Sequence, residues 1–397
     1  MVLLKKPTIQ LVFFLFLFSA FVQYKLFDIG GYSVRGYYLL SPILALLLFR
    51  YDFSHLRNVE TLYFVLLFAS CLHSFHVGGL NSYILLTCIS FLCFFIGQII
   101  FETLSEPEVR NIFILCAISI LSLILIRTFF TLSWLYDSLS NRYLLTDYYF
   151  IAPGGWNIEV THLGYLMLVL RKTRYFRLLF VTCLVLSLIY QSRAGMLFLF
   201  FSLALKPNLK LNFNSIAYFL LFIFAFSILS FVLVKYGGGD TVLDRFVDID
   251  YEVSNYEKGL GRLVLIDASI ELLKLDLFGY GVGLGMEYAQ RIYGDIQDAN
   301  FHNIYLQISI ESGIQALLVF LVIVSRIFTR CRSSNFNNGY ANAALCYAIT
   351  GLFQFNSYDP VGWLLIGLSL GNHRNMIRSF RPGISGNSKL SDNSVYS

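Results

Sequence analysis

Three basic residues in this sequence have side chains suited to handling a diphosphate. Arg193 lies in the segment Gln-Ser-Arg-Ala-Gly, at a short turn between two apolar runs. Arg262 opens an apolar stretch, and His302 precedes another apolar run. A guanidinium is always charged and can bind two phosphate oxygens at once, whereas a neutral imidazole can take a proton from an attacking hydroxyl. Two guanidiniums and one base are therefore the minimum for moving a sugar from a lipid diphosphate without a metal.

Each of these residues also has an ordinary structural explanation. An arginine near a membrane interface can extend its side chain to the lipid headgroups. For Arg193 the tight turn favours a functional interpretation, because a charge at the edge of the hydrocarbon layer is costly unless it is paired or lines a water-filled cavity. Taken alone, Arg262 is more simply a solvated charge and His302 a structural hydrogen-bonding residue. The functional interpretation is favoured only when the three residues are considered together.

Three acidic residues are secondary candidates. Glu311 follows His302 inside the next apolar run, where a carboxylate indicates either function or a hydrogen bond between packed helices. Glu159 lies near the end of a run and can simply reach for water. Asp359 precedes Pro360 and can cap the last helix.

The segment 279–285, Gly-Tyr-Gly-Val-Gly-Leu-Gly, resembles a nucleotide-binding loop only superficially. No strand is expected before it, and no Gly-Lys-Ser/Thr follows, so that interpretation is rejected. We expect its glycines to let the chain return to the membrane, with the backbone amides of Gly281 and Gly283 available to an anion.

The composition indicates a membrane protein. Of the 397 residues, 57% are apolar and only 13% are charged, and the mean hydropathy is +0.67. These values lie outside the range of soluble globular proteins, in which roughly a quarter of residues are charged. The net charge of +5 reflects the loops of a membrane protein, so it does not indicate nucleic-acid binding. The 7 cysteines lie almost entirely in apolar runs without paired spacing, which gives no indication of a disulfide framework or zinc site.

The pattern of apolar runs predicts an all-α, polytopic fold with about twelve spans. Each span must be helical, because only a helix satisfies its own backbone in lipid. The first run has the charge pattern of a signal peptide but no cleavage site, so we interpret it as an uncleaved span. The predicted spans lie near 8–26, 33–49, 59–77, 80–102, 110–127, 157–170, 176–191, 195–205, 213–235, 303–325, 340–355 and 360–371.

The distribution of lysine and arginine among the short connections predicts that both termini are cytoplasmic. Residues 1–372 then form the membrane domain, and residues 373–397 form a polar, disordered cytoplasmic tail. Two long loops, 127–156 and 236–302, fall on the outer face, which is the periplasm in a Gram-negative cell. The aromatic residues of the first loop are typical of a membrane-interface belt.

Within the second loop, residues 262–277 are predicted to form an amphipathic helix. Its apolar positions step by three and four residues, although further leucines between them weaken the contrast. We expect this helix to lie flat on the membrane with one face in the lipid. The apolar positions are Leu263, Ile266, Ile270, Leu273 and Leu277.

Over roughly residues 176–371, the motifs together resemble the O-antigen ligase/polymerase family of bacterial envelope glycan assembly. The resemblance rests on their order: Gln-Ser-Arg-Ala-Gly at a turn, then Gly-Arg followed by Gly-Tyr-Gly-Val-Gly, then His302-Asn303-x-Tyr305-Leu306 with Glu311-x-Gly313. Each motif is short, and the specificity comes from their order, spacing and shared placement on the outer face.

This resemblance implies a GT-C-like, metal-independent glycosyltransferase that uses a glycan linked to undecaprenyl diphosphate and needs no cofactor. By the same resemblance, Arg193 and Arg262 would bind the diphosphate, and His302 would be the base or would orient the acceptor. The residues expected to line the substrate site with them are Ser192, Asn303, Tyr305, Glu311, Gly281 and Gly283.

One pattern points toward a metal instead. Asp248 and Asp250 have the Asp-x-Asp spacing of metal-dependent glycosyltransferases. Two carboxylates in a long polar loop are more often solvated charges, and the family that the chain resembles needs no metal. We therefore keep the metal-free interpretation, which loss of activity with a chelator would reverse.

The resemblance leaves two activities open. A polymerase joins one lipid-linked repeat unit to another, whereas a ligase moves the finished chain to lipid A-core. The extreme hydrophobicity and the lack of an acceptor-specialised segment favour a polymerase of the bacterial inner membrane, which could work with a chain-length regulator and a repeat-unit flippase.

Two other classes of protein stay open as well. A transporter or flippase would fit twelve spans, but no matching halves are visible in the sequence. A scaffold for other envelope enzymes would predict that no single loop residue is essential.

Overall fold

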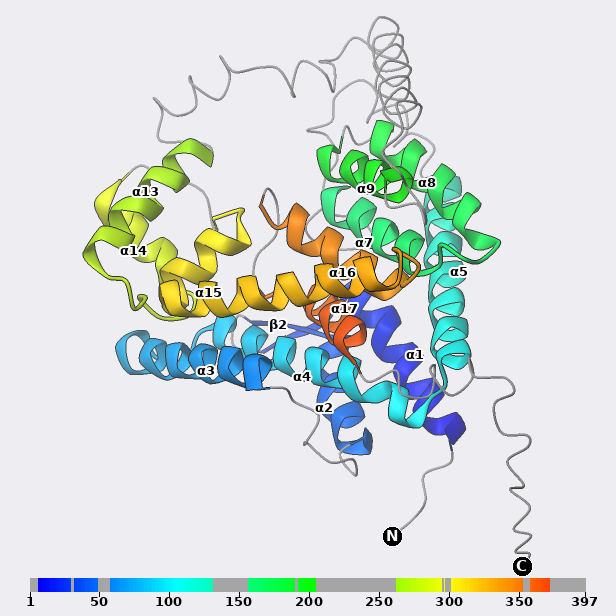
Figure 1. The fold of residues 1–397 in the computed structure, drawn as a ribbon, viewed down its shortest axis with the longest axis horizontal. Coiled ribbons are helices and arrows are strands. Elements are labelled where there is room, and N and C mark those ends of the chain that lie inside the picture. The colour runs from blue at the N-terminus through cyan, green and yellow to red at the C-terminus, as the bar shows by residue number, and fades with distance from the viewer. Residues whose placement is uncertain are drawn as a thin grey trace, which may run out of the picture.

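The computed structural model describes a bundle of helices with one short hairpin (Figure 1). The described residues are 6–29, 32–48, 58–130, 156–189, 192–204, 262–294, 296, 301–352 and 358–371. The first helices are α1 (Lys6–Val22), α2 (Gly36–Leu48), α3 (Asn58–Gly78), α4 (Ser82–Thr103) and α5 (Glu106–Phe130). The later helices are α7 (Trp156–Val169), α8 (Tyr175–Ile189), α9 (Arg193–Ala204), α13 (Arg262–Leu275), α14 (Gly285–Ile292), α15 (Ile304–Ser333), α16 (Gly339–Thr350) and α17 (Pro360–Leu370).

Every predicted span inside the described residues coincides with a helix, and the predicted span 213–235 lies outside them. Among the described residues, 4 helices are long and apolar enough to cross a membrane: α3, α4, α5 and α15. The other helices that coincide with predicted spans are apolar but shorter. The structure is compatible with a polytopic membrane protein, whereas twelve spans and a GT-C-like arrangement stay predictions.

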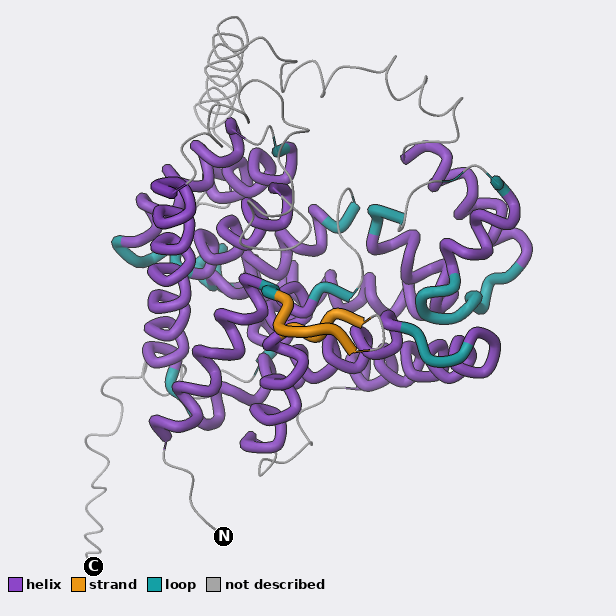
Figure 2. Tube along the Cα trace, turned by 180° about the vertical axis from the view of Figure 1, so that it is seen from behind, coloured by secondary structure: helices purple, strands orange, loops and turns teal. Residues whose placement is uncertain are grey.

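The all-helical prediction is wrong between α1 and α2. Here β1 (Lys25–Ile29) and β2 (Tyr32–Arg35) pair antiparallel, and the hairpin lies against the helices in Figure 2. The predicted first span, 8–26, is too long, because α1 ends at Val22 and Gln23 has a φ of 52°. Two short runs rich in aromatic and branched residues flank a Gly-Gly pair, which is a hairpin signal that counting apolar residues overlooks.

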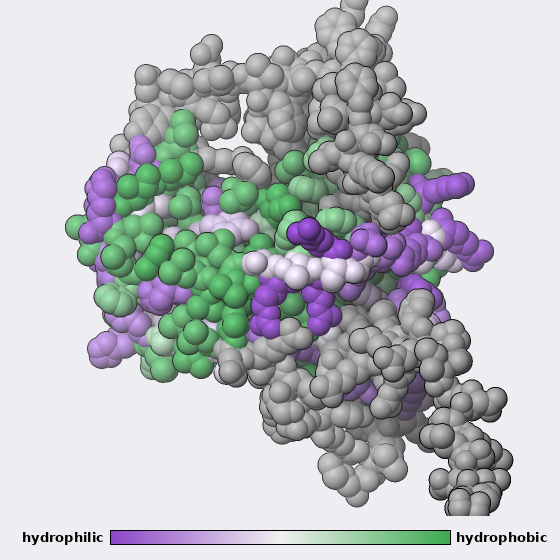
Figure 3. Space-filling model, in the orientation of Figure 1, coloured by the Kyte–Doolittle hydropathy of each residue, from purple (hydrophilic) through white to green (hydrophobic). Residues whose placement is uncertain are grey.

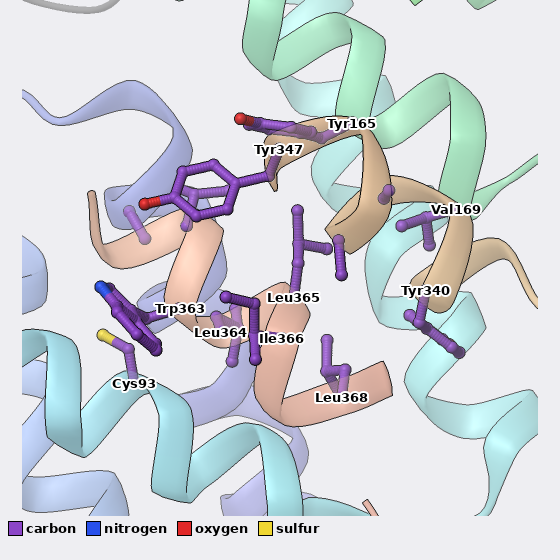
Figure 4. Packing of buried hydrophobic residues seen from close by; sticks show 14 of the residues in the cluster. Cys93, Tyr165, Val169, Tyr340, Tyr347, Trp363, Leu364, Leu365, Ile366 and Leu368 are labelled. Carbon is purple, nitrogen blue, oxygen red and sulfur yellow. The ribbon is translucent and has the colours of Figure 1, made fainter. Parts of the chain in front are cut away.

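Helices α4 and α17 form the centre of the core. A Cβ atom on Gly97 of α4 would lie 2.5 Å from the carbonyl oxygen of Leu364, and one on Gly367 of α17 would overlap the carbonyl of Phe94. Small residues allow two membrane helices to approach this closely. Figure 4 shows side chains of α17 in the same cluster as Tyr347 of α16 and Cys93 of α4.

Buried ion pairs join helices that are distant in sequence. Arg326 of α15 donates to both carboxylate oxygens of Glu60 at 2.8 Å, and Glu60 is fully buried. Arg127 of α5 donates to Glu159 of α7 at 2.7 Å. Such pairs satisfy charges that would be costly alone in an apolar surrounding.

The surface of the bundle carries many exposed apolar side chains. Figure 3 shows a broad hydrophobic patch with hydrophilic side chains toward its edges. On α3, for example, Leu72 is 71% exposed and Phe75 is 58% exposed. A face of this kind is typical of helices that contact lipid.

Helix α13 is apolar on two faces. Its buried face packs against α14 and α15 and consists of Val264, Leu265, Ala268 and Leu272. The face that the sequence assigns to the membrane stays largely exposed: Leu263 is 43% and Ile270 45% accessible. Two of the leucines that weaken the amphipathic pattern, Leu265 and Leu272, are thus core residues, whereas the third, Leu275, is 73% exposed.

Candidate functional site

His302 has a backbone conformation that is unusual for a residue with a side chain. Its φ is 49°, in the left-handed region, where the Cβ atom crowds the following carbonyl at a cost of about 1–2 kcal/mol. Its side chain is half-buried. Residues held in this way tend to occur at functional sites and persist only where the surrounding contacts fix them.

Asn303 supplies one set of these contacts by capping α15. Its side-chain oxygen accepts the N–H groups of Tyr305 at 2.9 Å and Leu306 at 3.1 Å, as expected of a residue at a helix N-terminus. Its side-chain nitrogen donates to the carbonyl of Leu352 at 3.1 Å. Asn303 therefore ties the start of α15 to the chain just beyond α16.

Two further hydrogen bonds anchor this turn on the end of α16. The amide of Ile304 donates to the carbonyl of Gly351 at 2.7 Å, and the hydroxyl of Tyr305 donates to the carbonyl of Ala348 at 2.8 Å. These contacts fix His302 relative to α16. A direct role of Asn303 or Tyr305 in substrate binding stays a prediction.

Arg193 is the first residue of α9, and Ser192 directly precedes it. Ser192 is fully buried; its amide donates to the carbonyl of Ser187 at 2.9 Å, and its hydroxyl accepts the amide of Gly195 at 3.3 Å. A Cβ atom on Gly195 would overlap Val160 of α7 and the side chain of Ser187. The start of α9 is thus packed tightly on α7 and α8, while the side chain of Arg193 lies outside the described set.

All three basic candidates stand at the start of a helix. Arg193 and Arg262 are the first residues of α9 and α13, and His302 directly precedes the cap of α15. The side chain of Arg262, like that of Arg193, is not described. A helix N-terminus carries a partial positive charge and free N–H groups, which bind anions and disfavour a neighbouring cation. An arginine at this position is therefore best satisfied when an anion lies beside it.

The helices that carry these residues form a connected series. Helix α13 packs on α15, α15 on α16, and α16 on α9. Figure 1 shows α13 and α14 on one side of the molecule and α7, α8 and α9 on the other. His302 lies at the junction of α15 and the end of α16. That the two guanidinium groups meet His302 stays a prediction.

Helix α15 is broken at Gly313, which the sequence does not reveal. Gly313 has φ 84° and ψ 166°, so the carbonyls before it lose their helical partners. The carbonyl of Ile310 accepts the amide of Tyr280 at 2.9 Å, and that of Glu311 accepts the amide of Gly281 at 2.9 Å. On the other side of the break, the amide of Ile314 donates to Leu277 at 3.0 Å. The glycine loop 276–284 thus replaces the hydrogen bonds that the break removes.

Three polar residues of α3 and the α3–α4 turn hold the break in α15 and the loop beside it. Ser70 donates to the carbonyl of Glu311 at 2.6 Å, and Ser74 donates to the carbonyl of Val282 at 2.7 Å. Asn81 donates to the same carbonyl of Val282 at 3.1 Å. Sequence reasoning missed these residues. Two serines four residues apart on one face of an apolar helix were the available signal.

The candidate substrate-binding residues around the break have protein partners. The amide of Gly281 donates to the backbone carbonyl of Glu311 in α15, and the amide of Gly283 donates to the carboxyl group of Glu311. Glu311 is 3% exposed and also accepts a hydrogen bond from Gln307 at 3.3 Å. Burial and the nearby Asp276 raise the pKa of Tyr280, which keeps its hydroxyl as a donor. Direct substrate binding by Gly281, Gly283 or Glu311 stays a prediction.

The other acidic candidates have structural partners. Glu159 pairs with Arg127, and Asp359 caps α17 by accepting the amides of Val361 at 3.1 Å and Gly362 at 3.3 Å. Within the described ranges, no group of three or more His, Cys, Asp or Glu residues could hold a metal ion. The Asp-x-Asp pair at 248–250 lies outside those ranges.

Comparison with known proteins gives one family. Residues 178–321 match the family described as O-antigen ligase, and this range contains Arg193, Arg262, His302 and Glu311. No curated protein matches the chain. Proteins of this family are membrane glycosyltransferase-like enzymes of the O-antigen ligase or polymerase type. The resemblance drawn from the sequence motifs is confirmed by this match, in that residues 178–321 are similar to the O-antigen ligase family.

Proposed function

We propose that the protein is a polysaccharide polymerase that joins repeat units carried on undecaprenyl diphosphate. The observation that carries this proposal is that Arg193, Arg262 and His302 each stand at the start of a helix. Three positively polarised helix ends and two guanidiniums are suited to a ligand with two adjacent phosphates. A soluble anion would need no apolar bundle around it, whereas a polyprenyl chain does.

In the proposed reaction, Arg193 and Arg262 bind the diphosphate of the donor. A hydroxyl at the nonreducing end of a second lipid-linked glycan attacks the anomeric carbon of the donor sugar. His302 takes the proton of that hydroxyl, the bond between the anomeric carbon and the phosphate oxygen breaks, and undecaprenyl diphosphate leaves. The two arginines stabilise the charge that develops on the leaving group.

The proposal includes a placement in the cell. The protein lies in the bacterial inner membrane with both termini cytoplasmic and the site on the periplasmic side, in keeping with the distribution of lysine and arginine. No cofactor or metal is required. A chain-length regulator and a repeat-unit flippase are the proposed partners, because repeat units must reach the outer face before they are joined.

The test is glycan transfer by purified protein in liposomes that contain lipid-linked repeat units. Wild-type protein is expected to give a ladder of longer products on a gel, and a chelator is expected to leave the ladder unchanged. Arg193→Ala, Arg262→Ala and His302→Ala should each abolish it at normal protein levels, whereas Arg291→Ala, an exposed arginine on α14, should not. A full ladder from all three variants would refute the mechanism.

A ligase is the second candidate, because the matching family is described as O-antigen ligase. The same assay separates the two activities through the acceptor. A polymerase elongates lipid-linked repeat units when these are the only glycans present. A ligase gives product only when lipid A-core is added, and that result would replace our proposal.

A further inference from the structure

The carboxyl group of Glu311 joins three parts of the molecule at the break in α15. The side chain is 3% exposed. It accepts the side-chain N–H of Gln307, one turn earlier in the same helix, at 3.3 Å, and the backbone amide of Gly283 in the glycine loop. The Tyr63 and Tyr83 side chains of α3 and α4 lie nearby.

The main chain of Glu311 is held by the same neighbours. Its carbonyl accepts the amide of Gly281 at 2.9 Å and the hydroxyl of Ser70 at 2.6 Å. One residue thus binds the glycine loop twice, through its side chain and through its backbone. A Cβ atom on Gly285, at the start of α14, would lie 3.1 Å from the Cγ atom of Glu311. The loop and the carboxyl group are therefore closely fitted.

A carboxylate is a costly choice for this position if packing is its only role. Burying one costs several kcal/mol unless hydrogen bonds compensate, and here the N–H groups of Gln307 and Gly283 supply them. Nearby, the hydroxyl of Tyr63 is buried and has no hydrogen-bond partner within the described part of the chain. The polar groups here exceed what helix packing requires, which favours a role in the site.

The location of Glu311 supplies that role. It lies about two helical turns beyond His302 on the segment of α15 that precedes the break. The glycine loop that it binds continues backward into α13, the helix that Arg262 begins. The contact between Glu311 and Gly283 therefore connects the helix that carries the proposed base with the helix that carries a proposed diphosphate ligand.

We propose that Glu311 is a positioning residue, which holds the glycine loop and α13 against α15 so that Arg262 and His302 keep a fixed separation. This inference rests on the proposed function. Glu311 acts through its hydrogen bond to Gly283 and does not contact the reacting atoms. A misplacement of about 1 Å can lower a rate about a hundredfold, so a lost hydrogen bond at this distance from the reaction is sufficient to matter.

The test compares Glu311→Ala, Glu311→Gln and Glu287→Gln in full-length protein. Glu287 is an exposed acid on α14, paired with Arg291, so it controls for the same substitution outside the buried contact. The first measurement is hydrogen exchange of the amides in residues 279–285. In Glu311→Ala they should exchange about tenfold faster or more, because a buried hydrogen bond is lost, and in Glu287→Gln they should match wild type.

The second measurement is the rate of glycan transfer at saturating donor. Glu311→Ala should be slower by about a hundredfold, and Glu311→Gln should recover most of the rate and the slow exchange, because its amide oxygen still accepts the Gly283 N–H. Unchanged exchange in Glu311→Ala would overturn the proposal. So would a Glu311→Gln variant with normal exchange and no transfer, because the carboxyl would then act chemically.

The two proposals fail in different ways. Wild-type protein that transfers no glycan would refute the proposed function and with it the positioning role. The exchange measurement needs no substrate, so it still decides whether Glu311 holds the loop.

Discussion

At the scale of single residues, the conformation of His302 is maintained by its neighbours. Asn303 and Tyr305 attach the chain to the end of α16 within one turn after His302, so the backbone cannot relax without breaking these bonds. Gln23, Asn335 and Phe336 have a similar positive φ, so the backbone alone does not assign a function. We propose that at His302 the strain fixes the direction of the imidazole for transfer.

We predict that stability and activity separate at this position. His302→Gly should unfold at a temperature equal to or above that of His302→Ala, because glycine adopts a positive φ without the cost of about 1–2 kcal/mol that a Cβ brings. Both variants should lack transfer activity. Thermal unfolding in detergent measures the stability of the two variants, and the transfer assay measures their activity. A His302→Gly variant that is less stable than His302→Ala would show that the turn is not strained. Transfer activity in either variant would show that His302 is dispensable.

Residue pairing across the bundle marks one limit of prediction from sequence. Arg127 and Glu159 are recognisable as charges near the ends of spans, but nothing in their spacing tells that they bind one another. The same holds for Glu60 and Arg326. Pairs of this kind depend on which helices become neighbours, and apolar periodicity contains no information on that choice.

At the scale of elements, the break in α15 is the feature that organises the site. The apolar run over 303–325 predicts one continuous span, and a single glycine inside such a run is tolerated in membrane helices. The break can be recognised only from the position of the loop 276–284, because amides of this loop bond to the α15 carbonyls that the break leaves without helical partners. Helix positions were therefore predictable from composition, whereas the break and the hairpin were not.

Three glycine substitutions test the break. In Gly313→Ala, the new Cβ would be strained by a φ of 84° and would lie 2.5 Å from the carbonyl oxygen of Phe278. Gly79→Ala has a φ of 78° but meets nothing within 4 Å, and Gly294→Ala has neither problem. We expect losses of more than about 2 kcal/mol for Gly313, about 1 kcal/mol for Gly79 and about none for Gly294.

Unfolding of the three variants in detergent, with the transfer assay beside it, provides the comparison. Only Gly313→Ala should also reduce transfer, because only this glycine lies at the junction of α15 and the loop. Equal stability of Gly313→Ala and Gly294→Ala would show that the helix can run straight through residue 313.

At the scale of the whole molecule, the sequence predicts which face of the membrane each connection occupies. Figure 1 shows α14 and α8 at opposite sides of the bundle. Gln290 of α14 and Lys172, in the turn before α8, are both exposed. The distribution of positive charge places Gln290 outside and Lys172 inside.

Cysteine labelling in intact cells tests this topology. A membrane-impermeant thiol reagent should label Gln290→Cys directly and Lys172→Cys only after permeabilisation. Wild-type protein gives the background, because its cysteines are buried or half-buried. The opposite pattern would move the proposed site to the cytoplasmic face, where a repeat unit would not need to cross the membrane before transfer.

The central claim is that residues from three distant segments meet at one lipid diphosphate. The most direct measurement is photolabelling of the purified protein with a polyprenyl diphosphate that carries a photoreactive group beside the phosphates, followed by peptide mapping. We predict labelled peptides around Arg193, Arg262 and His302, all suppressed together by unlabelled undecaprenyl diphosphate. Label confined to one of these segments, or label that the unlabelled lipid does not displace, would contradict the claim.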